Sequence, residues 1–287
     1  MPFSPLASPS ATRAALERHG VVLRKSLGQH FLVDDNVVGR ILTLASLTRE
    51  MHVLEIGTGI GTLTAALCTA AGAVVAVERD AALLPALEEL VTVCPGLQIV
   101  HADAVRVAVD EITTTLGPPV ALVANLPYAV AATVVLRCFE EIPSLASATV
   151  MVQAEVADRM AAAPGGKDYG AYTVKLALRA RPAGRFAVSR SCFMPPPRVD
   201  SSVLRLERMP ARDPALVRAA DSLAAAAFAQ RRKTLRNSVA AATGWQPTRF
   251  DEALAAAKID GSRRAEALSV DEYLVLAAEV RKCGLAP

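Results

Sequence analysis

The sequence predicts a doubly wound α/β domain followed by a small all-helical domain. The first observation is a series of short apolar, β-branched runs separated by segments of helical length, which is typical of a parallel sheet covered on both faces. The second is a change after Pro210, where Ala-rich helical periodicity replaces the strands. We therefore expect an N-terminal tail (1–22), an α/β domain (23–208) and a helical C-terminal domain (209–287).

The α/β domain is expected to begin with alternating strands and helices. Its parallel strands are predicted at His52–Ile56, Ala73–Val77, Leu97–Val100, Val120–Val123 and Thr149–Val152. The helices between them are predicted at Thr62–Ala71, Asp80–Val93 and Val130–Glu141. Antiparallel strands at the edge of the sheet are predicted at Arg185–Ser189 and Ser202–Glu207.

Both ends of the chain depart from this alternation. Met1–Arg13 is rich in Ser and Pro and predicts a loose tail. After Pro210, helices are predicted at Pro214–Gln230, Lys233–Thr243, Thr248–Ala257 and Val270–Lys282. Because no strand lies between these helices, they are expected to pack on one another as a separate unit.

Composition narrows the class of protein. Hydrophobic residues make up 52% of the chain and charged residues 21%, which predicts a large core and excludes wholesale disorder. The five cysteines form no C-x-x-C pair and the four histidines are scattered, so we predict neither a disulfide framework nor a metal site. The chain shows no uninterrupted apolar span for a bilayer and no apolar signal-peptide core, so we expect a cytoplasmic protein without a membrane partner.

A glycine-rich turn follows the first predicted strand, in Val53-Leu-Glu-Ile-Gly-Thr-Gly-Ile-Gly61. Gly57, Gly59 and Gly61 allow the backbone to approach a ligand closely because they have no Cβ. The spacing is not G-x-G-x-x-G, which argues against a dinucleotide pyrophosphate. Glu55 at the strand end also disfavours a phosphate and suits a cationic ligand. The alternative is a tight turn without a ligand.

Acidic side chains follow the next two predicted strands. Glu78 comes 21 residues after Gly57, where it can accept hydrogen bonds from both hydroxyls of a ribose. Asp103 follows the third strand, where it can accept a hydrogen bond from an adenine amino group. The alternative for each is a solvated charge at a strand end. Together they predict a nucleoside site at the carboxyl edge of the sheet, for a cofactor that carries a positive charge and no phosphate.

The motif Asn125-Leu-Pro-Tyr128 follows the fourth predicted strand. An amide, a proline-fixed backbone and an aromatic ring can hold an exocyclic amine against a π face. The Asn oxygen and a backbone carbonyl can accept its two N–H bonds, which draws electron density onto a poorly nucleophilic nitrogen. A proline turn after a strand is the alternative.

These motifs together resemble those of the ribosomal RNA adenine N6,N6-dimethyltransferases, which use S-adenosylmethionine. Lys25-Ser-Leu-Gly-Gln-His-Phe-Leu32 is similar to the K-x-x-G-Q-N-F-L signature that opens the domain in this family. Phe193-Met-Pro-Pro-Pro-Arg-Val-Asp-Ser201 is similar to its F-x-P-x-P-x-V-D-S loop. Residues 228–237 resemble a stretch of the branch that modifies small-subunit rRNA. The resemblance covers roughly residues 23–280 and implies a Rossmann-like S-adenosylmethionine methyltransferase domain.

The resemblance also implies residue roles. The cofactor would be lined by His30, Leu32, Gly57, Gly59, Gly61, Glu78, Asp103 and Asn125. Asn125 and Tyr128 would receive the target adenine, and Phe193 would stack on its other face. His30 replaces the usual Asn, so we expect altered affinity for the cofactor rather than lost activity. The implied reaction dimethylates N6 of two adjacent adenosines in the 3′-terminal hairpin of 16S rRNA, within the immature 30S subunit, and the implied enzyme is a monomer.

Charge is unevenly distributed in a way that suits an RNA partner. Residues 50–180 contain 7 basic against 14 acidic residues, whereas residues 181–240 contain 12 against 4. Such a basic segment can bind a polyanion, although a solvated basic face is the alternative. The residues predicted to contact RNA are Lys25, Arg231, Arg232, Lys233 and Arg236. The last four could instead cover neighbouring acids, but no acid lies between Asp221 and Asp251.

Three other functions stay open at this point. The first is a large-subunit rRNA adenine dimethylase that confers macrolide resistance, against which the 228–237 stretch argues. The second is a methyltransferase for DNA adenine or a small molecule, and the basic 181–240 segment disfavours the small molecule. The third is a non-catalytic rRNA-binding assembly factor, against which the intact Asn125, Tyr128 and Phe193 argue.

Overall fold

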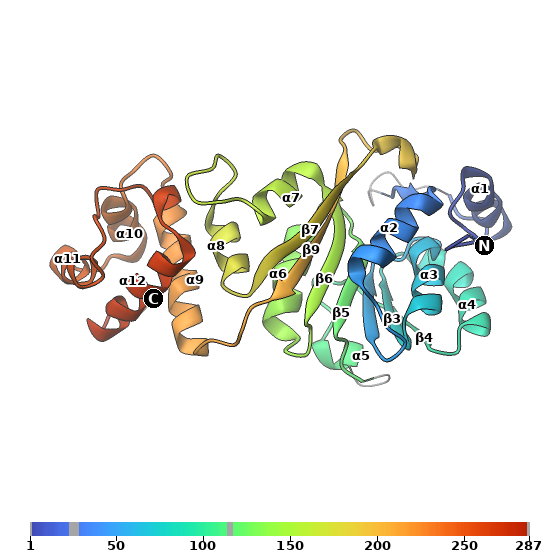
Figure 1. The fold of residues 1–287 in the computed structure, drawn as a ribbon, viewed down its shortest axis with the longest axis horizontal. Helices are drawn as coiled ribbons and strands as arrows, with labels where there is room; N and C mark the ends of the chain where they lie inside the picture. Colours follow the sequence, from blue (N-terminus) through green and yellow to red (C-terminus); the bar gives the residue numbers. More distant parts are fainter. Residues whose placement is uncertain (1, 23–28, 114–116, 286–287) are drawn as a thin grey trace. The chain divides into compact units, whose positions relative to one another are not determined.

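The computed structural model describes residues 2–22, 29–113 and 117–285, and the chain forms two compact units (Figure 1). The α/β unit consists of Met1–Ala157 and Pro182–Arg208. The helical unit consists of Asp158–Arg181 and Met209–Pro287. Each unit has a hydrophobic core of its own.

A seven-stranded sheet forms the centre of the α/β unit. Its strands lie in the order β4 (Leu97–His101), β3 (Ala73–Glu78), β2 (His52–Ile56), β5 (Ala121–Asn125), β6 (Ser147–Gln153), β9 (Ser201–Arg208) and β7 (Ala180–Val188). The first five are parallel, and β9 pairs antiparallel with β6. The chain runs outward from β2 to β4 and then returns to β5 on the other side of β2. This reversal places a topological switch point at the carboxyl ends of β2 and β5, where α/β proteins bind ligands.

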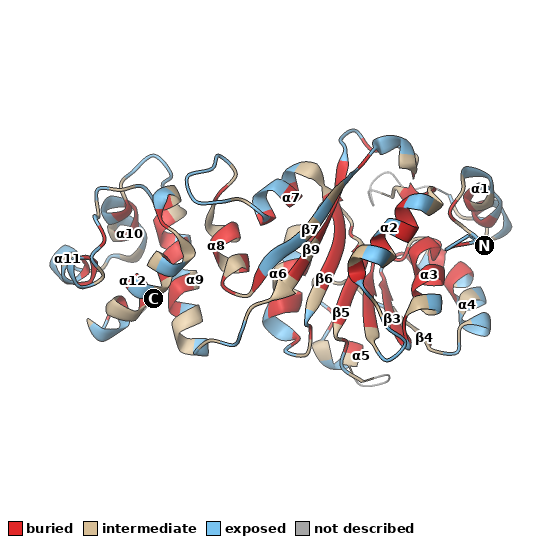
Figure 2. Cartoon of the chain, viewed as in Figure 1, coloured by how far each residue is buried: buried red, intermediate tan, exposed pale blue. Residues whose placement is uncertain are grey.

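Helices cover both faces of this sheet. Helices α2 (Asp35–Ala45) and α3 (Thr62–Ala70) share a core with one face. The remaining helical elements are η2 (Ala81–Leu83), α4 (Leu84–Val93), α5 (Val109–Thr113), α6 (Ala131–Glu141), α7 (Ala154–Met160) and η3 (Arg190–Cys192). All residues of β3 are buried, as a strand covered on both faces requires (Figure 2). The predicted doubly wound fold is therefore confirmed, although β7 begins five residues before the predicted edge strand.

The N-terminus is not the loose tail that its composition predicts. Residues Pro9–Arg18 form helix α1, which begins where the Ser8 side chain accepts a hydrogen bond from the Ala11 N–H. The helix buries Ala15 and Leu16 in a cluster that includes a residue of the glycine-rich loop, Ile60. This burial gives the segment tertiary contacts that a count of Ser and Pro does not reveal.

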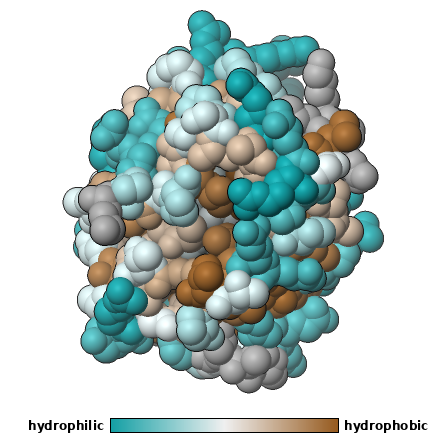
Figure 3. All heavy atoms as spheres, turned by 90° about the vertical axis from the view of Figure 1, so that its right-hand side faces the viewer, coloured by the Kyte–Doolittle hydropathy of each residue, from teal (hydrophilic) through white to brown (hydrophobic). Residues whose placement is uncertain are grey.

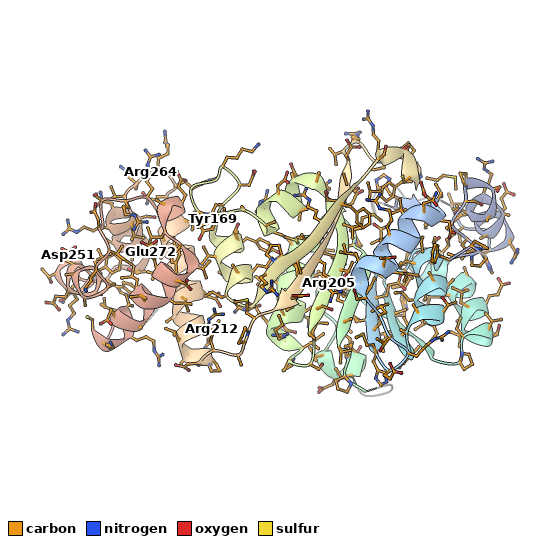
Figure 4. The ribbon with its side chains drawn as sticks, viewed as in Figure 1. Tyr169, Arg205, Arg212, Asp251, Arg264 and Glu272 are labelled. Atoms are coloured by element: carbon orange, nitrogen blue, oxygen red, sulfur yellow. The ribbon has the colours of Figure 1, made fainter. Side chains whose placement is uncertain are left out.

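The boundary between the units also differs from the expected one. Residues 158–181, expected in the α/β domain, pack in the helical unit and include α8 (Ala171–Ala177). Buried Tyr169 donates a hydrogen bond to the Leu268 carbonyl oxygen at 2.9 Å, and Figure 4 marks its position. The other helices of this unit are α9 (Pro214–Phe228), α10 (Leu235–Thr243), α11 (Pro247–Ala256), η4 (Ala265–Ala267) and α12 (Val270–Lys282). The segment joins this unit because Tyr169 and Val174 belong to its core.

The surface of the described residues has no feature that points to a bilayer or a structural metal. No helix of the described ranges combines the length and the apolar character that a membrane span needs. No three His, Cys, Asp or Glu side chains of these residues come together as a metal site. In the view of Figure 3, apolar residues reach the surface in small patches among hydrophilic ones.

Candidate active site

A cavity of about 560 Å³ lies at the carboxyl ends of the parallel strands. Segments before β1 (Phe31–Leu32) and after β2, β3, β4 and β5 all line it. The predicted site residues that line it are His30, Leu32, Gly57, Gly59, Glu78, Asp103, Asn125 and Tyr128. The structure thus brings together eight residues that the sequence spreads over about 100 positions, because parallel strands end at the same edge of a sheet.

The glycine-rich turn is held in an unusual backbone conformation. Gly57 and Gly59 have φ values of +77° and +60°, which side chains with a Cβ rarely adopt. A Cβ on Gly57 would lie 2.9 Å from Pro127 Cδ, so the turn approaches the Asn-Leu-Pro-Tyr loop too closely for any other residue. Gly61 does not line the cavity; it precedes α3, and a Cβ there would lie 2.3 Å from Leu90 Cδ1. Gly61 therefore serves packing against α4.

Glu78, at the end of β3, holds the glycine-rich turn through hydrogen bonds. Its Oε2 accepts hydrogen bonds from the Gly59 N–H at 3.1 Å and the Thr58 hydroxyl at 3.2 Å. Its Oε1 accepts from the Arg79 and Asp80 N–H groups, both at 2.8 Å. These four bonds fill the roughly four acceptor positions of a carboxylate. A ribose bound by Glu78 must therefore exchange with one of them.

Glu55 is a buried acid beside the same cavity. Its side chain is 1% exposed, and its Oε2 has no hydrogen-bond partner among the described residues. Burial, reinforced by the nearby charge of Glu78, raises the pKa of Glu55 to about 8. A cation placed in the cavity would favour the ionised form of Glu55, so this enclosed carboxyl would act on a cationic ligand through its charge rather than through direct contact.

The raised pKa of Glu55 predicts a loss of stability at high pH. An acid whose pKa rises on folding, here from 4.5 to about 8, stabilises the protein fully below pH 4.5 and loses that contribution as pH approaches 8. Relative to the variant Glu55→Gln, the wild-type free energy of unfolding should fall by about 2 kcal/mol between pH 6 and pH 9. Urea unfolding at the two pH values measures this difference. The variant Glu50→Gln, at an exposed position, serves as a control and should lose stability between pH 6 and pH 9 as the wild type does. If Glu55→Gln also loses as much stability as the wild type, the raised pKa does not belong to Glu55.

Asp103 and Arg79 close one side of the cavity. Asp103 Oδ1 accepts a hydrogen bond from the Val105 N–H at 3.0 Å, and its Oδ2 lies 3.7 Å from an Arg79 guanidinium nitrogen. About a third of the Asp103 side chain is exposed, which leaves it open to a ligand. Arg79 also lines the cavity but was not predicted as a site residue. The signal available in the sequence was its position directly after Glu78, at the end of a parallel strand.

Asn125 is the last residue of β5, and its amide is oriented by a backbone carbonyl. Its Nδ2 donates a long hydrogen bond of 3.4 Å to the His30 carbonyl oxygen. Because a carbonyl oxygen can only accept, it must face the Asn125 amide nitrogen, and this fixes the orientation of the amide. The Asn125 Oδ1 then points away from that bond and stays available as an acceptor. Leu126, which is buried, anchors the following turn through a 3.1 Å bond from its N–H to the Met151 carbonyl oxygen.

Tyr128 completes this turn at the cavity wall. Its hydroxyl lies 2.6 Å from the Ser201 Oγ, so the ring is fixed at its outer end. Burial raises the pKa of Tyr128 above its ordinary value, which favours the neutral phenol over the phenolate. An imidazole, that of His30, lies nearly parallel to it with ring centroids 5.8 Å apart.

Phe193, which is expected to stack on the target adenine, does not line the cavity of the described structure. It belongs to β8 (Phe193–Met194), which pairs antiparallel with β1 so that Phe193 faces Leu32 in register. The ring is 3% exposed and belongs to the core cluster rather than to the cavity lining. The Phe193 ring is stabilised by burial in this core. The sequence motif alone does not show this, because the burial depends on the pairing of β8 with β1.

Sequence reasoning also missed polar residues that shape the cavity. Gln29 donates a hydrogen bond to the Asp80 carboxylate at 2.7 Å, and both residues line the cavity. Asp80 also begins η2 by accepting from the Ala82 N–H. An acid directly before a helix is a recognisable cap, so the signal was present in the sequence.

Four of the five predicted RNA-contacting residues lie in the described ranges, and two of these four already lie beside acidic side chains. Arg236 forms two hydrogen bonds with the Asp251 carboxylate, at 2.6 and 2.5 Å, at the end of the unit where Figure 4 marks Asp251. Arg231 lies 3.7 Å from Glu266 and donates to the Lys167 carbonyl oxygen. The remaining two predictions in this segment, Arg232 and Lys233, are exposed and have no ion-pair partner within the described ranges. Lys25 lies outside the described residues.

The fold and the cavity define a class before any relative is considered. A doubly wound sheet with an acid-held glycine turn and an Asn-Leu-Pro-Tyr loop at its switch point is the architecture of an S-adenosylmethionine-dependent methyltransferase. Known sequences then give the particular family. The sequence profile described as "Ribosomal RNA adenine dimethylase" matches residues 21–282. The chain therefore belongs to the ribosomal RNA adenine dimethylase family.

Individual relatives agree with this assignment. Ribosomal RNA small subunit methyltransferase A of Rhodococcus opacus is 45% identical over 285 residues, which cover 95% of this chain and 94% of the relative. The protein of the same name from Pelotomaculum thermopropionicum is 43% identical over 286 residues, covering 95% and 96%.

Solved structures share the fold over nearly the whole chain. A dimethyladenosine transferase from Plasmodium falciparum has a TM-score of 0.74 at 23% identity, and the match covers 89% of this chain and 98% of that one. The 23S rRNA methyltransferase ErmE has a TM-score of 0.64 at 26% identity, with 88% and 99% covered. These structures confirm the predicted Rossmann-like methyltransferase fold.

Proposed function

We propose that this protein uses S-adenosylmethionine to dimethylate N6 of two adjacent adenosines in the 3′-terminal hairpin of 16S rRNA, within the immature 30S subunit. The observation that carries the proposal is the placement of Asn125 and Tyr128 at the wall of the nucleoside-type cavity. The small-subunit names of relatives at 43% and 45% identity favour 16S over 23S rRNA. We also propose that it acts as a monomer in the cytoplasm.

The residues around the cavity fit this cofactor. S-adenosylmethionine, when bound, supplies a methyl group activated by a positively charged sulfur. A cationic ligand would favour the ionised form of buried Glu55, and the one arginine or lysine among the described lining residues, Arg79, lies 3.7 Å from the Asp103 carboxylate. Glu78 and Asp103 offer carboxylates for ribose hydroxyls and for an adenine amino group, at the ends of neighbouring strands. Gly57 and Gly59 leave room for the ligand beside the backbone.

The contribution of the protein to the chemical step is alignment. The Asn125 Oδ1 and a backbone carbonyl can accept the two N–H bonds of the target amine, which orients its lone pair. The Tyr128 ring can stack on the base, which returns roughly 1–3 kcal/mol of the cost of extruding it from the RNA. Holding nucleophile and methyl group in line lowers the barrier by proximity and orientation, without a strong base.

The experiment that tests this function is a methyl-transfer assay with three substrates. Immature 30S particles, naked 16S rRNA and mature 50S particles are incubated with labelled S-adenosylmethionine, and the nucleosides are identified by mass spectrometry. We expect N6-dimethyladenosine only from small-subunit rRNA, with the immature particle as the best substrate. Modification of 50S particles would instead indicate the large-subunit dimethylase, and binding to 30S without methylation would indicate an assembly factor.

RNA binding is proposed to depend on the turn between α9 and α10, which contains Arg232 and Lys233. The double variant Arg232→Gln, Lys233→Gln should flatten the dependence of log K on log salt by about 1.4–1.8, because each of the two phosphate contacts contributes about 0.7–0.9 to the slope. Filter binding to 16S rRNA at salt concentrations from about 50 to about 200 mM measures this slope.

A matched control lies three residues further along the chain. Arg236→Gln should change the slope by less than about 0.5, since its charge is already paired with Asp251. Circular dichroism establishes that each variant is folded. An unaltered slope in the double variant would place the RNA contacts elsewhere on the protein.

A further inference from the structure

His30 lies directly before β1 and places its ring against Tyr128. The ring centroids are 5.8 Å apart and the ring planes meet at 26°, within the range of aromatic stacking. Both residues line the same cavity. One face of Tyr128 is therefore already covered by a side chain of the protein.

Two hydrogen bonds hold His30 in this place. Its Nδ1 lies 2.7 Å from the Pro195 carbonyl oxygen, and because a carbonyl can only accept, Nδ1 carries the proton and donates it. Its own carbonyl oxygen accepts the bond from Asn125 Nδ2. His30 thus contacts both residues of the proposed target site, through its ring and through its backbone.

The space between the two rings is too small for a base. Carbon atoms in contact lie about 3.5 Å apart, so a base between two rings requires roughly 7 Å from ring to ring. The observed separation of 5.8 Å falls short of that. A target adenine can use this face of Tyr128 only after the His30 ring has moved.

We propose that His30 is a gate at the target site, which occupies the stacking face of Tyr128 until an RNA base displaces it. This proposal rests on the proposed function, because it names the step at which the target adenine is admitted. Opening breaks the bond from His30 Nδ1 to the Pro195 carbonyl and exchanges one stack for another. The related signature has Asn at this position, which has no ring to cover Tyr128, so the gate is a property of this chain.

The loop that holds the gate closed carries exposed charge. Pro195 and Arg198 lie between β8 and β9, and Arg198 is exposed. RNA phosphates attracted to Arg198 would act on the same loop whose carbonyl fixes His30.

The kinetic test replaces the gate with the residue of the related signature. For His30→Asn, we expect kcat/KM with immature 30S particles to rise about three- to tenfold, the effect of one net hydrogen bond. Because His30 also lines the cofactor cavity, the dissociation constant of S-adenosylmethionine is measured for each protein by calorimetry, and kcat/KM for the RNA is compared at saturating cofactor. His19→Asn is the control, since His19 instead contacts Glu89 on the protein surface. A fall in kcat/KM, or no change, would overturn the gate.

A second measurement does not depend on methyl transfer. Nitration of tyrosines by tetranitromethane, mapped by mass spectrometry, reports how accessible Tyr128 is, and Tyr172 in the helical unit serves as the internal reference. Relative to Tyr172, nitration of Tyr128 should be at least about threefold faster in His30→Asn than in the wild type. An equal ratio refutes the gate. If this ratio rises in His30→Asn but the wild-type protein methylates no rRNA, His30 still covers Tyr128 and only the proposed function is refuted.

Discussion

Asn125→Ala should bind 16S rRNA nearly as well as the wild-type protein but transfer methyl groups about 100-fold more slowly or worse, the effect of losing one well-placed polar contact in a dry site. Affinity for RNA comes mainly from phosphate contacts, which this substitution leaves in place. The rate falls because the Asn125 Oδ1 is the acceptor that the bond to the His30 carbonyl leaves available for the target amine. Single-turnover methylation of immature 30S particles, at saturating S-adenosylmethionine, isolates the chemical step.

Variants at Tyr128 control for damage to the loop. Tyr128→Phe removes the bond to Ser201 but keeps the ring, so its rate should fall by less than about tenfold. Tyr128→Ala removes the stacking face and should be much slower than Tyr128→Phe. Products are resolved into mono- and dimethyladenosine, which shows whether either transfer is affected alone. If Asn125→Ala methylates at the wild-type rate, the target amine is held elsewhere.

The arrangement of the cavity could be predicted because the sequence places its chemistry at strand ends. Glu78 and Asn125 close β3 and β5, and the carboxyl ends of parallel strands converge on the switch point. Apolar runs define those strands, so recognising the runs is enough to bring the polar residues together. The same reasoning cannot say which hydrogen bonds Glu78 makes, because they depend on the path of the glycine-rich turn.

What the sequence did not reveal are contacts between segments far apart along the chain. Phe193 stays a predicted contact of the target base, and the pairing of β8 with β1 places its ring in the core beside Leu32. Tyr169 lies in a segment expected in the α/β domain, yet it packs in the core of the helical unit. Asp251 pairs with Arg236 although 15 positions separate them. Local periodicity carries no information on such pairings, because burial and charge complementarity decide them only in the folded chain.

Glu78→Ala should weaken binding of S-adenosylmethionine by about 100-fold or more, from the loss of charge-assisted hydrogen bonds of about 1.5–3 kcal/mol each. Part of this loss is indirect, because the Glu78 carboxylate also holds the Gly59 N–H and the Thr58 hydroxyl. The Thr58 hydroxyl, at 3.2 Å, is the donor that a ribose hydroxyl can most readily replace. Binding to ribose and support of the turn must therefore be measured separately.

A comparison of two nucleosides makes this separation. Adenosine and 2′,3′-dideoxyadenosine differ only in the 2′ and 3′ hydroxyls of the ribose. Competition of each compound against bound S-adenosylmethionine therefore gives the contribution of those hydroxyls to the binding free energy in each protein. In the wild type the dideoxy compound should bind at least about tenfold more weakly than adenosine. In Glu78→Ala the two compounds should bind alike, because removing the carboxylate and removing the hydroxyls delete the same direct contact and their effects are then non-additive. A disturbed turn alone would weaken both ligands and preserve the difference. Discrimination that persists in Glu78→Ala would therefore assign the ribose to another residue and leave Glu78 as the support of the glycine-rich turn.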